Sequence, residues 1–254
     1  AHAAGQRHAG DVVLFNGDPR ALRLGLLGED AAMIPAAGTE PRSLSAFVWS
    51  FAATATGHAP AHHNLYFGHV PNAEFPDIRK NRLPDDPTLY VCAQDRGNGA
   101  VPDGPERFEI ILNGPPRAGP RPDPKEQQRC RETTFDRLAR MGLTFDPVPE
   151  SASLTTPEQF DALFPGSAGS LYGLSPHGMM APFRRPRART SLPGLYLAGG
   201  GVHPGAGVPM AASSGRLAAE AILTDLASTS PSRRTGTAGG TSTGSARTAA
   251  APSR

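Results

Sequence analysis

A short apolar run, a glycine-rich loop and an amphipathic helix follow one another late in this chain, and this order constrains the fold most. Residues 195–222 read LYLAGGGVHPGAGVPMAASSGRLAAEAI. The pattern predicts a strand over residues 195–198 and a helix over residues 208–226, with Pro209 at the first helical position. The glycines between them let a ligand approach the backbone without obstruction by side chains.

The predicted helix begins without a capping side chain. The residue before Pro209 is Val208, whose side chain accepts no hydrogen bond. The amides of Met210, Ala211 and Ala212 therefore lack a hydrogen-bond acceptor. A ligand oxygen or phosphate could accept from them, and the helix dipole would favour its negative charge. We expect this segment to contact a cofactor. The simpler alternative is a turn that only joins a strand to a helix.

The loop departs from the usual dinucleotide fingerprint, G-x-G-x-x-G. Residues 205–210, GAGVPM, match its first two glycines but place Met210 where the third glycine permits close packing of helix on strand. No acidic residue stands at the end of a following strand to bind a ribose. This segment is therefore not expected to cradle ADP.

Strand and helix patterns recur along the rest of the chain. Strands are predicted over residues 11–17, 43–54, 64–70, 88–95 and 106–116. Helices are predicted over residues 20–28, 124–142 and 156–166, the second with a buried stripe of Cys130, Phe135, Leu138 and Met141. The middle of the chain lacks a repeating β-α-β rhythm, which is typical of an α+β region.

Composition excludes several classes of function. A formal net charge of +2 gives no broad basic surface for nucleic acid. The basic run at residues 182–190, PFRRPRART, is either a solvated loop or a contact for anionic lipid. No apolar run reaches the roughly 20 residues of a membrane-spanning helix, and we expect no signal peptide. Cys92 and Cys130 stand in unlike surroundings, which fits a reducing compartment without disulfides.

Histidines crowd residues 58–69, HAPAHHNLYFGH, and raise the question of a metal site. They are His58, His62, His63 and His69. Pro60 breaks any helix here, and neither a cysteine nor a carboxylate completes a ligand set in the sequence, so no metal site is predicted. His177 and His203 are expected to be polar groups near the cofactor or hydrogen-bonded core histidines.

Three segments of the sequence resemble a known family. Residues 194–222 resemble the carboxy-terminal FAD-binding segment of the phytoene desaturase group of carotenoid oxidoreductases, which are amine-oxidase-like flavoproteins. Residues 170–196 resemble the segment that precedes it, and residues 11–22, DVVLFNGDPRAL, the strand and turn of that family. Val-Pro-Met-Ala at residues 208–211, with LYVCAQDR and RFEIILNGPP, is most similar to the 1-hydroxycarotenoid 3,4-desaturase (methoxyneurosporene dehydrogenase) branch.

The resemblance implies a fold of α/β plus α+β class. It would be the carboxy-terminal part of a two-domain FAD-binding fold of the GR2, amine-oxidase-like type, without the amino-terminal Rossmann βαβ unit. The implied divisions are a strand and turn of the FAD domain at residues 1–20, a mixed α+β substrate region at 21–175, a carboxy-terminal FAD-binding segment at 176–227, and a tail at 228–254. That tail has almost no bulky apolar residue and is expected to be disordered.

The resemblance also implies which residues bind FAD. Gly200 and Gly201 would pass near the ribityl phosphate, and the amides of Met210 and Ala211 would face the pyrimidine edge of the flavin. The implied cofactor-binding residues are Gly200, Gly201, Gly207, Val208, Pro209, Met210 and Ala211. No catalytic side chain is identified, because the flavin supplies the difficult step.

By resemblance, the chain would belong to an FAD-dependent oxidoreductase of carotenoid biosynthesis. The enzyme would remove hydrogens from a CH2-CH2 unit of an acyclic 1-hydroxycarotenoid, a 3,4-desaturation, in the cytoplasm and peripherally at the inner or intracytoplasmic membrane. The alternatives are a non-catalytic remnant that binds an apolar lipid or carotenoid, and a carotenoid isomerase or saturase on the same scaffold.

Aromatic residues gather in the middle region, and they permit two interpretations. They are Phe47, Trp49, Phe51, Tyr66 and Phe67. They are expected to form a core, with the lining of a pocket for a long polyene as the alternative.

Overall fold

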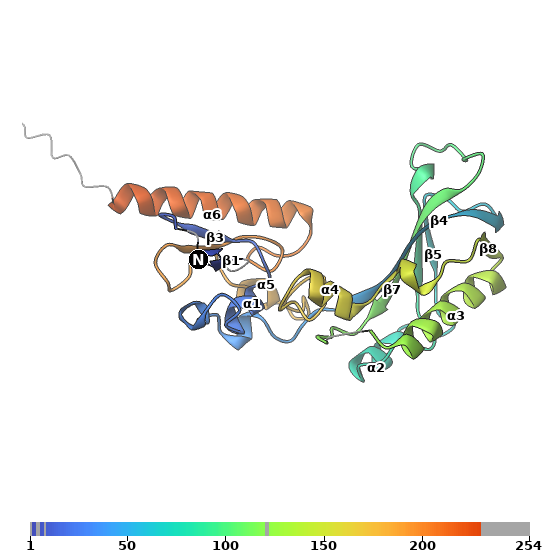
Figure 1. Ribbon diagram of the computed structural model, residues 1–254, viewed down its shortest axis with the longest axis horizontal. Helices are drawn as coiled ribbons and strands as arrows, with labels where there is room; N and C mark the ends of the chain where they lie inside the picture. Colours follow the sequence, from blue (N-terminus) through green and yellow to red (C-terminus); the bar gives the residue numbers. More distant parts are fainter. Residues whose placement is uncertain (1, 4–5, 8, 120–121, 230–254) are drawn as a thin grey trace, which may run out of the picture.

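Two hydrophobic cores organise the molecule, and each belongs to one of the two lobes in Figure 1. The computed structural model describes residues 2–3, 6–7, 9–119 and 122–229. One lobe is an antiparallel sheet covered by a helix, and the other contains a pair of parallel strands beneath a long helix. The mixture of helix and sheet expected from the sequence is confirmed.

The larger lobe is built on a six-stranded antiparallel sheet in the order β5-β6-β7-β4-β8, with β9 also paired to β4. Its strands are β4 (Ser45–Gly57), β5 (His63–Tyr66), β6 (Leu89–Ala93), β7 (Glu106–Gly114), β8 (Leu143–Asp146) and β9 (Leu154–Thr155). The long strand β4 pairs with β7 along one edge and with β8 and β9 along the other. Strand β4 is therefore the central strand that connects the two parts of the sheet.

Helix α3 (Pro124–Arg140) covers one face of this sheet. It begins where Asp123 accepts a hydrogen bond from the amide of Lys125 at 3.0 Å, with Pro124 at the first helical position. Phe135 on the helix meets fully buried Trp49 edge to face, with ring centroids 5.1 Å apart. Such a pair adds about 1 kcal/mol beyond the area that it buries.

The aromatic residues of this region divide between core and surface. Phe47 and Trp49 are fully buried, and Phe51 and Tyr66 pack against the same core. Phe67 is 68% exposed, so the expected core role is wrong for this residue. Met141 is also more exposed than predicted, because it is the residue that follows the last turn of α3.

The smaller lobe pairs β3 (Val13–Phe15) with β10 (Leu195–Leu197) in parallel. Its other elements are β1 (His2–Ala3), β2 (Gln6–Arg7), α1 (Pro19–Arg23), α5 (Ala181–Arg184) and α6 (Val208–Thr229), with short 3-10 turns at Glu29–Ala31 and Ala36–Gly38. Its core brings Leu22, Ala31 and Ile34 against Leu195 and Leu197. The lobe therefore extends well beyond residue 20, where the sequence places the division.

Two further helices complete the fold. Helix α2 (Glu74–Arg79) lies beside the large sheet, and α4 (Pro157–Leu163) lies between the two lobes (Figure 1). Gln159 Oε1 accepts a hydrogen bond from the Thr156 amide at 2.8 Å, which helps to fix the start of α4. The remaining 3-10 turns are Gln94–Arg96 and Ser151–Ser153.

The carboxy-terminal helix follows the sequence prediction closely. Helix α6 buries Ser214, Ala218 and Ala221 on the face that packs against β10. It continues to Thr229, slightly past the predicted end, and the tail at residues 230–254 lies outside the described residues. Within the described ranges, none of the helices is both long enough and apolar enough to span a membrane.

Candidate functional site

A cavity of about 580 Å³ lies where the two lobes meet. Three segments contribute to its lining: the end of β3 with α1 and the following turn, the stretch from α4 to Gly173, and the loop after β10 at Gly200 and Gly201. These segments are far apart in sequence. The cavity is therefore a product of the tertiary fold.

The parallel pairing of β3 with β10 places two tight loops side by side. Because parallel strands end at the same edge of a sheet, the turn at Asn16 and the loop at Gly199 emerge together. A Cβ atom at Gly199 would lie 2.6 Å from Asn16 Oδ1, and one at Gly201 would lie 2.6 Å from Pro19 Cδ. Only glycine permits this close approach of the loop to the start of α1.

Asp18 and Arg42 join two walls of the cavity by a nearly buried ion pair. Asp18 also caps α1, since its Oδ1 accepts a hydrogen bond from the Arg20 amide at 2.9 Å. Arg42 donates from Nη2 and Nε to the Ser167 carbonyl at 2.9 and 3.2 Å. One guanidinium thus fixes the start of α1 against the segment that follows α4.

Arg185 fixes the glycine loop through hydrogen bonds to backbone carbonyls. It donates to the Gly200 carbonyl from Nη1 and to the carbonyls of Tyr172 and Leu174 from Nη2, each at 2.9 Å. Burial lowers the pKa of Arg185, and repulsion from Arg42 lowers it further, against the attraction of Asp18. A buried cation bonded to three carbonyls leaves its positive charge beside the cavity, where it favours negative charge on a ligand.

The outer wall of the cavity is apolar. It is formed by Leu26, Leu27, Phe160, Leu163, Phe164 and Leu171. Leu163 and Phe164 are 66% and 62% exposed, which is unusual for side chains of this size. An apolar wall opposite a polar turn and a glycine loop suits a ligand with one polar end and one long hydrocarbon part.

The predicted cofactor-binding residues separate into two groups. Gly200 and Gly201 line the cavity. The other five, Gly207, Val208, Pro209, Met210 and Ala211, do not contribute to the lining of this cavity and lie at the amino-terminal end of α6. Val208 is 85% exposed and Met210 is 47% exposed.

The hydrogen bonds at the start of α6 correct one expectation. The Ala211 amide donates to the Gly207 carbonyl at 2.9 Å, so it is not free for a ligand. Gly207 acts as the first acceptor of the helix, as a start at Val208 requires and one residue earlier than the predicted first helical position, Pro209, implies. Pro209 has no N–H group, which leaves the amides of Val208 and Met210 as donors in this turn.

Neither predicted histidine contributes to the cavity lining. His203 Nδ1 lies 3.3 Å from the Pro182 carbonyl, and its ring stacks on Phe183 with centroids 6.5 Å apart. His177 is exposed on the loop before α5. His203 thus braces the glycine loop against α5.

Sequence reasoning missed several residues that build the site. Asp18 was recognised only as part of the NGDP turn, and its partner Arg42 stands far along the chain in a segment without a motif. The lining residues of α4 carried only a helix pattern. Asp18 was the one available signal, because Asp before Pro at a helix start marks a cap.

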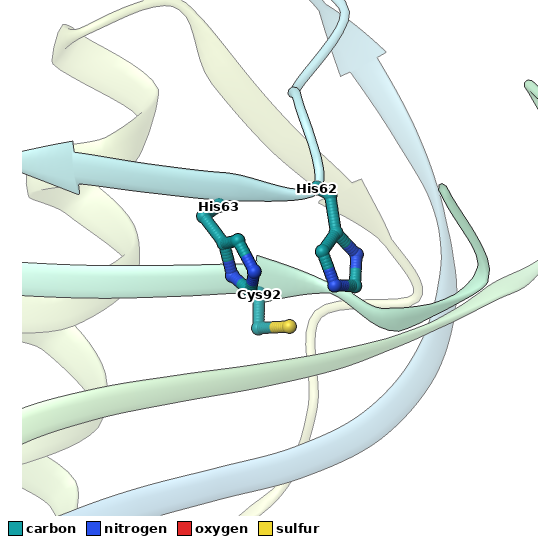
Figure 2. Close-up of side chains that lie close together, drawn as sticks. All are labelled: His62, His63 and Cys92. Carbon is teal, nitrogen blue, oxygen red and sulfur yellow. The ribbon is translucent and has the colours of Figure 1, made fainter. Parts of the chain in front are cut away.

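The crowded histidines are partly brought together. His58 lies 2.7 Å from the Tyr66 hydroxyl, and His69 pairs with Asp86. His62 and His63 stand beside Cys92 in Figure 2. A cysteine therefore does accompany these histidines, contrary to the expectation from sequence.

Known proteins resemble this chain over most of its length. It is 58% identical over 229 residues to the hydroxyneurosporene desaturase of Cereibacter sphaeroides, covering 90% of this chain and 46% of the relative. Corresponding proteins of Rhodobacter capsulatus and Rubrivivax gelatinosus are 56% and 46% identical, covering 84% and 97% of this chain but 43% and 48% of the relatives. The chain thus spans about half the length of the curated relatives that it matches.

A family match agrees with these relatives. Residues 74–223 match the family described as flavin containing amine oxidoreductase, a span that includes α3, α4, β10 and most of α6. The resemblance drawn from residues 194–222 is confirmed by these comparisons. This chain belongs to the flavin-containing amine oxidoreductase family.

Proposed function

We propose that this chain forms the carboxy-terminal part of an FAD-dependent carotenoid desaturase. Its substrate is an acyclic 1-hydroxycarotenoid, and its reaction is 3,4-desaturation of a CH2-CH2 unit. The observation that carries the proposal is the cavity between the lobes, where a glycine loop and a capped turn face an apolar wall. The relatives named hydroxyneurosporene desaturase support the same substrate class.

The residues present fit a flavin nucleotide. Gly200 has no protein atom closer than 3.7 Å to a Cβ built on it, so the backbone there is open to a ligand. Gly201 is held close to Pro19, and Arg185 fixes the Gly200 carbonyl. The loop is therefore both accessible and rigid, as a cofactor loop needs to be.

The residues of the cavity have separable roles in this proposal. Bound FAD supplies the acceptor for the hydride that leaves the substrate carbon. Arg185, beside the cavity, would favour negative charge on the bound flavin. The amide of Met210 lies outside the cavity lining and would add the field of the α6 amino-terminal end. Leu163 and Phe164 hold the hydrocarbon chain and exclude water.

The proposed reaction does not require an acid or base from the cavity wall. Loss of hydride from one carbon makes the hydrogen on the neighbouring carbon acidic, so a water molecule at the open rim of the cavity can accept that proton. Asp18 lines the cavity, but its pairing with Arg42 and its capping bond give it a positioning role. The chain mainly orients the substrate and limits the access of water to the reacting carbons.

A peripheral membrane contact, in the cytoplasm, completes the proposal. Met179, Met180 and Phe183 are 92%, 62% and 68% exposed, and they stand beside Arg184 and the basic run that follows. Apolar side chains flanked by arginines suit the surface of an anionic bilayer, from which a carotenoid would enter. Replacing Met180 and Phe183 by Ser is expected to reduce sedimentation with anionic vesicles, and unchanged sedimentation would contradict this contact.

The proposal is tested by restoring the rest of the enzyme. This chain is joined to the amino-terminal half of the Cereibacter sphaeroides relative, and the flavin absorbance of the purified protein is measured. The same relative, cut and rejoined at the matching position, is the control. Flavin in both proteins supports the proposal. Flavin in the control alone favours a non-catalytic remnant that binds an apolar lipid.

A further inference from the structure

The side chains of His62, His63 and Cys92 converge at one corner of the large sheet. One nitrogen of each imidazole and the Cys92 sulfur all lie within 4.8 Å of one another. Figure 2 shows both rings turned toward the sulfur, one from the loop that enters β5 and one from β5 itself. Cys92 reaches them from the neighbouring strand β6.

Strand register creates this cluster. His63 pairs directly with Cys92 across the antiparallel ladder, which brings their side chains to the same face of the sheet. His62 stands just before β5, where its carbonyl accepts the Ala93 amide at 2.9 Å. The backbone of both histidines is therefore held by β6.

One nitrogen of each ring is hydrogen-bonded, which leaves the other nitrogen for a metal. His62 Nδ1 lies 2.9 Å from the Ala93 carbonyl, which fixes the proton on that nitrogen and leaves Nε2 with its lone pair. His63 Nδ1 lies 2.7 Å from the Tyr90 hydroxyl. A carbonyl or hydroxyl behind a histidine is the usual support of a metal-binding imidazole.

The charges around the cluster favour a cation. Glu109 pairs with Cys92 on the other side of β6, so its carboxylate stands on the same face. The two nearby arginines are neutralised, because Arg96 pairs with Glu106 at 2.5 Å and Arg107 pairs with Asp95 at 2.5 Å. A metal bound here would be attracted by the Cys92 thiolate and the Glu109 carboxylate. The paired guanidinium groups of Arg96 and Arg107 would repel it little.

We propose that His62, His63 and Cys92 bind one transition-metal ion of the Zn²⁺ class. Two imidazole nitrogens and one thiolate are borderline-soft donors, which select Zn²⁺ over Mg²⁺ or Ca²⁺. On binding, the Cys92 thiol releases its proton to solvent and the sulfur bonds to the metal. Donors of a tetrahedral zinc site stand roughly 3.5 Å apart, so the cluster closes by about 1 Å of side-chain movement.

The site has a structural consequence for the sheet. β5 is a four-residue edge strand that pairs with β6 alone among the described strands. A metal shared by His63 and Cys92 ties this edge to the interior strand. Binding to the folded state stabilises it by mass action, so Zn²⁺ is expected to raise the thermal midpoint.

The test uses Co²⁺ as a spectroscopic probe of the purified protein. We expect one Co²⁺ per chain with a thiolate-to-metal charge-transfer band, and Zn²⁺ should displace it. Cys92→Ser should abolish the band, and His62→Gln or His63→Gln should weaken Co²⁺ binding at least about tenfold, the scale on which zinc sites respond to altered support. His177→Gln, at an exposed histidine elsewhere, is the matched control and should change nothing.

A second measurement needs no variant. Burial raises the pKa of the Cys130 thiol to about 12, so this cysteine resists alkylation in the folded protein. Cys92 is 7% exposed and Cys130 is 0% exposed, so iodoacetamide reacts first with Cys92. Zn²⁺ should slow that alkylation at least about tenfold if the sulfur is a ligand. An unchanged alkylation rate, or a charge-transfer band that survives Cys92→Ser, overturns the proposal.

Discussion

The Asp18 carboxylate and the Arg42 guanidinium form a nearly buried ion pair that fastens the start of α1 to the segment after α4. Their side chains are 10% and 6% exposed. Arg42 also donates to the Ser167 carbonyl, so it satisfies groups on both walls of the cavity. The pair therefore sets the shape of the proposed flavin site without touching the reacting atoms.

Removing one partner of this pair should be costly. Arg42→Met leaves the Asp18 carboxylate buried without its partner, and we expect a loss of about 3 kcal/mol in the free energy of unfolding. Urea denaturation measures this loss. Arg107→Met, which breaks an exposed pair with Asp95, is the control and should have no measurable effect. Equal effects of the two substitutions would contradict the structural role of Arg42.

The glycine loop gives a second prediction. Gly201→Ala places a methyl group 2.6 Å from Pro19 Cδ, and the shift that relieves it should cost about 1–3 kcal/mol of stability. In the rejoined enzyme the same substitution should lower flavin affinity. Gly215→Ala is the matched control, because its Cβ meets nothing within 4 Å and a helical alanine is favoured. If Gly201→Ala leaves the flavin affinity unchanged, this loop does not contact the cofactor.

A third prediction concerns pH. Burial raises the pKa of the Asp86 carboxyl, but hydrogen bonds from Arg137 and His69 outweigh burial and lower it to about 2. The unfolded carboxyl has its ordinary, higher pKa, so its contribution is complete above that value and falls as pH drops toward 2. Asp86→Asn should cost about 1–2 kcal/mol at pH 7.

The pH profile separates this effect from general destabilisation. Urea midpoints of wild type and Asp86→Asn should converge as pH falls below 4, because the wild-type carboxyl then becomes protonated. Asp85→Asn is the neighbouring control, since Asp85 is 75% exposed and pairs with half-exposed Arg129. A difference between wild type and Asp86→Asn that stays constant from pH 7 to pH 3 contradicts the assignment.

The proposed metal site predicts a role for the Tyr90 hydroxyl. Tyr90→Phe removes the group that lies 2.7 Å from His63 Nδ1 while keeping the ring. Loss of this support should weaken Co²⁺ binding by about tenfold and leave the charge-transfer band in place. Tyr172→Phe, at a half-exposed tyrosine elsewhere, is the control. Loss of the charge-transfer band in Tyr90→Phe would contradict a role of the hydroxyl that is limited to holding the His63 imidazole in place.

Local sequence signals predicted most of the elements. Helix α3 follows from Pro124 at its start and Gly142 just past its end, and both agree with the observed bounds. The strand, loop and helix from β10 to α6 were also predicted, since Pro209 and the glycines are strong local markers. Met141 was misplaced because helical periodicity does not show where the last turn ends.

Residues brought together by register or long-range packing were not predictable in the same way. His63 and Cys92 meet because β5 and β6 pair in one particular register, which no pattern within either strand specifies. Arg42 reaches Asp18 across the junction of the lobes. A helix starting at Pro209 predicts a free Ala211 amide, whereas α6 starts at Val208 and Gly207 accepts that amide.

The most direct test is the product formed by the rejoined enzyme from hydroxyneurosporene. We expect a product that is two hydrogens lighter and absorbs at longer wavelength, because desaturation lengthens the conjugated polyene. A product of unchanged mass would identify an isomerase, and a heavier product a saturase. Flavin-loaded enzyme that forms either of these, or no product, would contradict the proposed desaturation.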